Sequence, residues 1–388
     1  MIRKSGLVGG LLFICSFVFV LASIVPAAAS PAWNYVSASG TSYALFRAGG
    51  SSVYDPVTNE MIVFGGTALD PAQGYPHAND VWILTNANGL GGPGTWTNLI
   101  PNGTAGSPAG RHNHSAVYDS VNNRMIIYGG CEGGCYPLAY DIWVLINANG
   151  QGGTPTWQQL SPSGFPPGRQ GHQAVYDPNT NSMIVWGGQN GGGSCGGYND
   201  VWVLSNANGL GGVPAWTQLS PTKTGPTGQY YSGAVYDATN NIMMVFGGSN
   251  MVGACTGLPS SATYTLSHAN GTGGVPVWKK ISAGSLTLAR SQPAMVYNPV
   301  SNHITVFGGN SATSSLADAY TLAYANGIGG VPTWTKLAPT FAFWKPSAGA
   351  RWNNQGIDIT NNRMIMTAGS NADGPFWSTW ALSGADNQ

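Results

Sequence analysis

The sequence predicts an all-β protein made of six similar units, each with four strands, that close into a ring. Three observations support this prediction. A β-rich run ending in Gly-Gly recurs with a period of about 60 residues. Each copy has the same neighbours, a short β-type run before it and two aromatic-containing runs after it. The outer strand that the last unit lacks is found near the start of the chain.

The composition agrees with an ordered β protein. Hydrophobic residues make up 43% of the 388 residues and aromatic residues 11%, which is more than a disordered chain contains. The 57 glycines and 25 prolines fit many short strands joined by turns. Only 7% of the residues are charged and the formal net charge is zero, so we expect no nucleic-acid partner.

The first 29 residues differ from the rest. Arg3 and Lys4 precede an apolar run from Leu7 to Val25, and three alanines then lead to Ser30. This layout predicts a signal peptide over residues 1–29 and a mature domain over residues 30–388, secreted or periplasmic and outside the membrane after cleavage. An uncleaved N-terminal membrane anchor is the alternative, because the apolar run is nearly long enough to span a bilayer.

The Gly-Gly marker defines the second strand of each unit. Its copies are MIVFGG at Met61, MIIYGG at Met125, MIVWGG at Met183, MMVFGG at Met243, ITVFGG at Ile304 and the weaker MIMTAG at Met364. A run such as AVYD precedes each marker and supplies the first strand. Turns such as DPVTN join the two runs, so each pair is predicted to form a hairpin.

Two further strands follow each marker. The third strand centres on an aromatic residue: Trp82, Trp143, Trp202, Tyr264, Tyr320 and Trp380. A connector, NANGLGG or a close copy, leads to the fourth strand, which contains Trp96, Trp157, Trp216, Trp278 and Trp334. The sixth unit ends without a fourth strand, whereas AWNYV at Ala32 is similar to TWTNL at Thr95. We therefore expect the N-terminal strand to complete the last sheet and close the ring.

The repeat of Gly-Gly, spaced aromatic and tryptophan, with five full copies and a weaker sixth from Ser30 to Leu382, resembles the kelch repeat. The resemblance implies a six-bladed β-propeller with four antiparallel strands in each blade. The long NANGxGG connectors and the Thr-Ala-Gly of the sixth unit depart from the pattern. We interpret the recurring aromatics and glycines as structural, because residues repeated in every unit build the fold.

The loops between strands four and one and between strands two and three share one face of such a propeller, which we call the top face. These loops vary in sequence, which is typical of a binding surface. A basic residue recurs at the start of the first strands, with glutamine in unit four: Arg47, Arg111, Arg169, Gln229, Arg290 and Arg351. These residues are candidate ligand contacts at the top-face rim of the central channel, because guanidinium groups suit carboxylates. The alternative is that each arginine bonds loop carbonyls of its own blade and braces the ring.

Two histidines follow their arginines by three residues, His114 and His172. They are candidate ligand contacts or acid/base groups near the channel. The alternative is that both are buried and hydrogen-bonded.

Four cysteines follow the predicted signal peptide: Cys131, Cys135, Cys195 and Cys255. An even number in an exported chain predicts disulfides, and we expect Cys131–Cys135 and Cys195–Cys255. Zinc is the alternative for the C-x-x-x-C of Cys131 and Cys135, although the chain has no CxxC pair.

The sequence contains no G-x-S-x-G elbow and no H-E-x-x-H zinc motif. It therefore predicts no catalytic residue, no metal and no cofactor. We expect a monomeric binding module that holds a carbohydrate or another protein on the top face. The resemblance also implies an alternative, a sugar-active enzyme such as a sialic acid mutarotase, in which the arginines would hold a carboxylate.

Overall fold

The computed structural model describes residues 1, 30–40, 47–68, 77–191, 196–250, 257–281, 289–341, 354–367, 370–371, 374–375 and 378–386. Throughout these residues the secondary structure consists of strands and turns. This part of the chain has no helix of the length and apolarity needed to cross a membrane. Residues 2–29 of the predicted signal peptide, together with Arg351, Cys195 and Cys255, lie outside the described residues.

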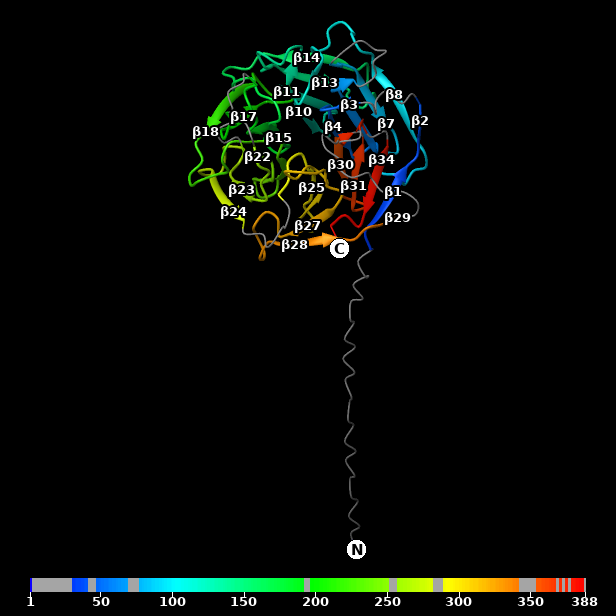
Figure 1. The fold of residues 1–388 in the computed structure, drawn as a ribbon, viewed down its shortest axis with the longest axis vertical. Coiled ribbons are helices and arrows are strands. Elements are labelled where there is room, and N and C mark those ends of the chain that lie inside the picture. Colours follow the sequence, from blue (N-terminus) through cyan, green and yellow to red (C-terminus); the bar gives the residue numbers. More distant parts are fainter. Residues whose placement is uncertain are drawn as a thin grey trace.

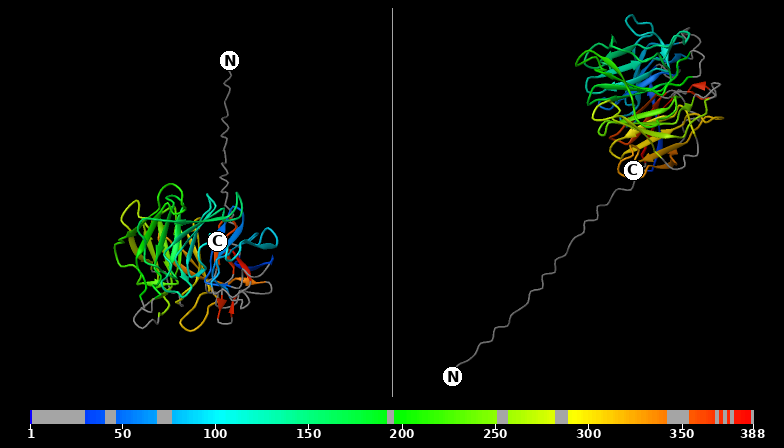
Figure 2. Two further views of the ribbon diagram at one scale, coloured as in Figure 1. Left: turned by 90° about the horizontal axis from the view of Figure 1, so that it is seen from above. Right: turned by 90° about the vertical axis from the view of Figure 1, so that its left-hand side faces the viewer.

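The strands form a six-bladed β-propeller, as predicted. Figure 1 shows the blades following one another around a central axis in the order of the sequence, from blue to red. The first strand of each blade lies beside the axis and the fourth lies at the rim. Side views show the strands running between two faces, which carry the loops (Figure 2). The loops of one face therefore meet at the mouth of the channel.

Each of the first three blades is an antiparallel sheet whose strands follow the chain. Blade one contains β4 (Ser51–Asp55), β5 (Glu60–Phe64), β7 (Val81–Leu84) and β8 (Gly94–Ile100). Blade two contains β10 (Ser115–Asp119), β11 (Arg124–Tyr128), β13 (Ile142–Ile146) and β14 (Thr156–Leu160). Blade three contains β15 (Gln173–Asp177), β16 (Ser182–Trp186), β17 (Val201–Ser205) and β18 (Ala215–Leu219).

Blades four and five repeat this order, and blade six joins the two ends of the chain. Blade four contains β20 (Gly233–Asp237), β21 (Ile242–Phe246), β23 (Thr263–Ser267) and β24 (Val277–Ile281). Blade five contains β25 (Ala294–Asn298), β26 (His303–Phe307), β27 (Ala319–Ala323) and β28 (Thr333–Leu337). Blade six contains β30 (Asn354–Asp358), β31 (Arg363–Thr367), β34 (Thr379–Ser383) and β1 (Ala32–Val36).

The predicted closure of the ring is confirmed in blade six. Strand β1 pairs antiparallel with β34, with Trp33 opposite Leu382 and Tyr35 opposite Trp380. The blue β1 lies beside the red β34 in Figure 1. The N-terminal strand β1 takes the outer position of the last sheet. This sheet therefore has four strands although no connector and fourth strand follow β34 in the sequence.

Short strand pairs extend the blades on the top face. They are β3 (Arg47–Ala48) with β6 (Thr67–Ala68), β9 (Arg111–His112) with β12 (Cys131–Glu132), β19 (Gln229–Tyr230) with β22 (Ser249–Asn250), and β32 (Ser370–Asn371) with β33 (Gly374–Pro375). Two further short strands run parallel to outer strands, β2 (Ala38–Ser39) beside β8 and β29 (Thr340–Phe341) beside β1. Three of the top-face pairs contain a residue of the recurring basic position, namely Arg47, Arg111 and Gln229.

The core lies between adjacent blades. The aromatic residue that precedes Gly-Gly in one blade contacts the fourth-strand tryptophan of the next blade. These pairs are Phe64–Trp157, Tyr128–Trp216, Trp186–Trp278, Phe246–Trp334 and Phe307–Trp33, with ring centroids 4.8–6.1 Å apart. Blade six has Thr367 in the aromatic position, and its hydroxyl lies 2.8 Å from that of Thr379. Burial of large aromatic surface between blades therefore stabilises the ring.

The NANG connectors link the blades on the opposite face. The asparagine directly before the first glycine of each connector donates through Nδ2 to a buried aspartate that ends the first strand of the preceding blade. These bonds are Asn88–Asp358, Asn149–Asp55, Asn208–Asp119, Asn270–Asp177 and Asn326–Asp237, 2.6–2.8 Å long. Between blades five and six the roles are reversed, since Asn298 donates to Asp386 over 2.9 Å. The connectors therefore build the ring.

Candidate functional site

The recurring arginines are buried beneath the top face. Arg111, Arg169 and Arg290 are 0% exposed and Arg47 is 5% exposed. Each donates from Nη1 to the carbonyl of the first glycine of its own Gly-Gly pair: Gly65, Gly129, Gly187 and Gly308. Each also forms an ion pair with an aspartate just before its third strand: Asp80, Asp141, Asp200 and Asp318. Of the two alternatives, this is the one in which the arginines brace the ring, and it leaves these side chains almost no exposed surface.

The aspartates join the arginines to the third strands. Asp200 accepts two hydrogen bonds from Arg169, at 2.7 and 2.9 Å, and one from Nε1 of Trp202 at 2.7 Å. Burial alone would raise the pKa of Asp200, but the hydrogen bonds and charge of Arg169 outweigh it and lower that pKa below its usual value. The positive charge of Arg169 is therefore compensated inside its own blade.

Blade four lacks both members of this pair. Gln229 replaces the arginine, is buried, and donates to Oδ1 of Asn250 at 2.7 Å. The aspartate position holds Ala262. Because a lone buried carboxylate would be costly, the two residues change together.

His114 and His172 lie between blades. Nε2 of His114 is 2.6 Å from Oγ of Ser51, and Nε2 of His172 is 2.8 Å from Oγ of Ser115. In each pair the serine belongs to the preceding blade. Burial, and then the nearby Arg169, lower the pKa of His172 to about 3. Burial and Arg111 lower the pKa of His114 well below its usual value. Both rings are thus neutral, hydrogen-bonded parts of the blade interfaces, the second of the alternatives given for them.

The channel rim is formed by the residues two positions after the arginines. Gly49, Asn113, Gly171, Tyr231 and Gln292 all have a positive φ, between 54° and 70°. From Asn113 onward, the N–H of each rim residue donates to the carbonyl of the equivalent residue in the blade before, over 2.6–2.9 Å. A chain of backbone hydrogen bonds therefore runs around the described part of the channel mouth.

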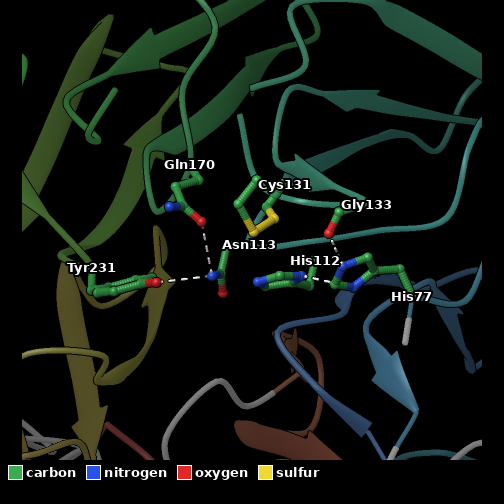
Figure 3. The surroundings of a disulfide bond; sticks show 8 residues. His77, His112, Asn113, Cys131, Gly133, Gln170 and Tyr231 are labelled. Carbon is green, nitrogen blue, oxygen red and sulfur yellow. Dashed lines mark hydrogen bonds between the residues drawn. A yellow bond between two sulfur atoms is a disulfide. The ribbon is translucent and has the colours of Figure 1, made fainter. Parts of the chain in front are cut away.

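Two rim side chains meet across blade three. Nδ2 of Asn113 donates to the hydroxyl of Tyr231 at 2.9 Å and to Oε1 of Gln170 at 3.3 Å. Figure 3 shows Asn113 between these two residues. The ring of Tyr231 lies over Gly171, where a Cβ would come within 2.8 Å of it. Glycine in blade three therefore makes room for a tyrosine of blade four to reach an asparagine of blade two.

Beside the rim, two histidines lie close to a disulfide. The structure has the expected disulfide between Cys131 and Cys135. The Nδ1 atoms of His112 and His77 are 3.1 Å apart, and Nε2 of His77 is 3.0 Å from the carbonyl oxygen of Gly133. Burial, and then the neighbouring His77, lower the pKa of His112 to about 4. Sequence reasoning did not single out either histidine.

Comparison with known proteins identifies the repeat. A family model described as "KLHDC2/KLHL20/DRC7 Kelch-repeats domain" matches residues 151–276. Adagio-like protein 3 of Oryza sativa subsp. japonica is 29% identical over 273 residues, 67% of this chain and 38% of that protein. Adagio-like protein 1 of the same organism is 28% identical over 275 residues, 67% of this chain and 39% of that protein. The chain thus spans less than half the length of these curated relatives.

The chain is a kelch-repeat β-propeller. A solved structure described as "Structure of YjhT" superimposes with a TM-score of 0.57 at 15% identity, covering 87% of this chain and 93% of that one. At this identity the match establishes the fold alone. Within this kelch propeller, the aromatic, Gly-Gly and arginine positions repeat from blade to blade, whereas the rim residues and the histidine pair do not.

Proposed function

We propose that this kelch propeller is a binding module that holds an uncharged carbohydrate at the top-face mouth of its channel. The observation that carries the proposal is the rim formed by Asn113, Tyr231 and Gln292, which are partly exposed and come from three different blades. Amide and phenol groups both donate and accept hydrogen bonds, which suits the hydroxyl groups of a sugar. The rings of Tyr230 and Tyr231, with centroids 4.8 Å apart, add apolar surface beside them.

The charge distribution favours an uncharged ligand. The four described arginines of the recurring position are buried and each is paired with an aspartate. A sugar-active enzyme that holds a carboxylate with these arginines would need free guanidinium groups, and the described residues do not offer them. The enzyme alternative therefore gains no support from this geometry.

A protein ligand is the second candidate, and it is favoured by exposed aromatic side chains on the top-face loops of blades two and three. Tyr136, Tyr140 and Phe165 are 74%, 58% and 63% exposed. Tyr140 and Phe165 also contact one another, with ring centroids 5.5 Å apart. Exposed tyrosine and phenylalanine are typical of protein–protein contact surfaces.

A glycan array followed by calorimetry with the best neutral oligosaccharide tests the carbohydrate proposal. We expect Tyr231→Ala and Asn113→Ala to weaken binding at least tenfold while the melting temperature changes little. The matched control is His268→Asn in a connector on the opposite face, where blades one to three already have asparagine. Unchanged affinity in both rim variants would refute the assignment. Loss of protein capture in Tyr140→Ser, with no glycan bound, would favour the second candidate.

A further inference from the structure

Four metal-ligating side chains converge on the top face between blades one and two. They are His77, His112, Cys131 and Cys135, and one potential ligand atom of each lies within 4.8 Å of those of the others. Strand β9 places His112 opposite Cys131 in β12, and Cys135 follows in the same loop. His77 comes from the preceding blade, just before β7. Figure 3 shows the two imidazole rings side by side next to the disulfide.

The propeller fold does not require any of these residue types. The position of His112 is occupied in other blades by Ala48, Gln170, Tyr230 and Ser291. The position of Cys131, directly after Gly-Gly, is occupied by Thr67, Gln189, Ser249 and Asn310. The position of His77 is occupied by Leu138, Gly197, Pro259 and Ser315. Residues that build the ring recur, so the meeting of four that do not recur indicates a specific role.

The hydrogen bonds of His77 leave one of its nitrogens suited to bind a metal. The carbonyl of Gly133 can only accept, so Nε2 of His77 carries the hydrogen and donates it over 3.0 Å. In the neutral ring Nδ1 then keeps its lone pair, and this atom faces Nδ1 of His112 at 3.1 Å. A backbone carbonyl that fixes the tautomer and orientation of a ligating histidine is the usual outer partner of a metal-bound imidazole.

We propose that, when the Cys131–Cys135 disulfide is reduced, this cluster binds a zinc ion through two thiolates and the imidazoles of His77 and His112. Two thiolates, two imidazoles and Zn²⁺ give a centre with no net charge, which suits its half-buried place. Zinc–sulfur bonds of about 2.3 Å and zinc–nitrogen bonds of about 2.0 Å place tetrahedral ligands about 3–4 Å apart. The present spacing is close to that requirement.

The disulfide and the metal centre use the same two sulfur atoms, so they exclude each other. A dithiol reductant supplies two electrons that cleave the S–S bond and two protons that form the thiols, and it becomes a cyclic disulfide. Zinc then displaces one proton from each thiol. The disulfide joins residues four apart within one loop, whereas the metal would also hold His77 and so connect blade one to blade two. The redox state would thereby decide whether a metal ion, in addition to the hydrogen bonds of His77, links these two top-face loops.

Cobalt substitution tests the proposal, because Co²⁺ bound by thiolates in a tetrahedral site has intense visible and charge-transfer absorption. The protein with Cys195→Ser and Cys255→Ser is reduced with dithiothreitol, desalted without oxygen and titrated with Co²⁺ and then Zn²⁺. We expect one equivalent of cobalt to give the tetrahedral thiolate spectrum and one equivalent of zinc to remove it. The oxidised protein should give no such spectrum. A reduced protein without the spectrum, or an equal signal in the oxidised protein, would overturn the proposal.

Ligand variants test the four side chains separately. We expect Cys135→Ser to abolish the tetrahedral thiolate spectrum, and His77→Ala and His112→Asn each to weaken zinc affinity at least tenfold. His268→Asn, on the opposite face, should leave affinity unchanged. Circular dichroism and the melting temperature of each variant, measured without metal, show whether the propeller is folded. If folded His77→Ala and His112→Asn proteins keep full zinc affinity, the imidazoles are not zinc ligands and the assignment is refuted.

Discussion

The reversed hydrogen bond between blades five and six gives the sharpest test of how the ring is held. In five junctions an asparagine of the connector donates to an aspartate of the preceding blade. In the sixth, Asn298 of blade five donates to Asp386, which occupies the connector position of blade six. Exchanging the two residues, Asn298→Asp with Asp386→Asn, restores the pattern of the other junctions.

The single change Asn298→Asp should be strongly destabilising. Asn298 and Asp386 are 5% and 3% exposed, so two carboxylates would face each other away from water. Loss of a hydrogen bond to a charged group costs about 1.5–3 kcal/mol. Two like charges about 4 Å apart repel by about 4 kcal/mol at an effective dielectric constant of about 20. We expect the free energy of unfolding to fall by at least about 4 kcal/mol.

The single change Asp386→Asn places an amide opposite the amide of Asn298 and should lower the free energy of unfolding by about 1–2 kcal/mol. In the double variant, the amide introduced at position 386 would donate to the new carboxylate and accept from Asn362, as Asn88 does with Asp358 and Asn59. The double variant should remain less stable than the original protein. In blade one the equivalent aspartate, Asp55, also accepts a hydrogen bond from the hydroxyl of Tyr118. The position equivalent to Tyr118 in blade six is Ile357, which has no hydroxyl to donate.

Urea unfolding of the four proteins, followed by tryptophan fluorescence with the disulfide state held constant, measures this cycle. We expect a coupling energy of at least about 2 kcal/mol, with the double variant more stable than Asn298→Asp alone. If the two changes are additive, or if Asn298→Asp costs less than about 1 kcal/mol, these hydrogen bonds do not hold the blades together.

Two further predictions concern buried groups of blade three. Arg169→Ala should lower the free energy of unfolding by about 3–5 kcal/mol, because it leaves Asp200 unpaired. The double variant Arg169→Gln with Asp200→Ala copies Gln229 and Ala262 of blade four. In the same urea titration its free energy of unfolding should fall by less than that of Arg169→Ala, and an equal fall would contradict the bracing role. For His172, the unfolded chain binds a proton below pH 6.5 that the folded chain takes up only near pH 3. Stability should therefore fall as the pH drops through this window, by up to about 1.4 kcal/mol per pH unit, and His172→Gln should lack that part of the slope.

The repeated features could be predicted from the sequence because they are local. The strand before each Gly-Gly, the hairpin turn and the aromatic third strand are each encoded within about ten residues. The closing role of Ala32–Val36 followed from its similarity to the strand at Thr95, and the register of β1 on β34 confirms it.

Whether the recurring arginines are buried or exposed could be decided only from the structure. Their position near the channel mouth followed from the repeat, but the direction of each side chain depends on an aspartate about 30 residues further along. The sequence did contain a signal, since Asp80, Asp141, Asp200 and Asp318 accompany four of the five arginines and unit four lacks both, although unit six has Ser378 in the aspartate position. The same pattern in the sequence is equally consistent with an ion pair exposed on the surface.

The sequence by itself determined the number of blades, the strands in each and the way in which the ring closes, because these depend on short patterns repeated six times. Only the tertiary structure decided which polar groups are exposed. It buried the repeated arginines and brought His77 and His112 to the disulfide and Asn113 to Tyr231. Such contacts join segments of different blades, and their distance in space depends on how the blades pack rather than on any pattern along the chain.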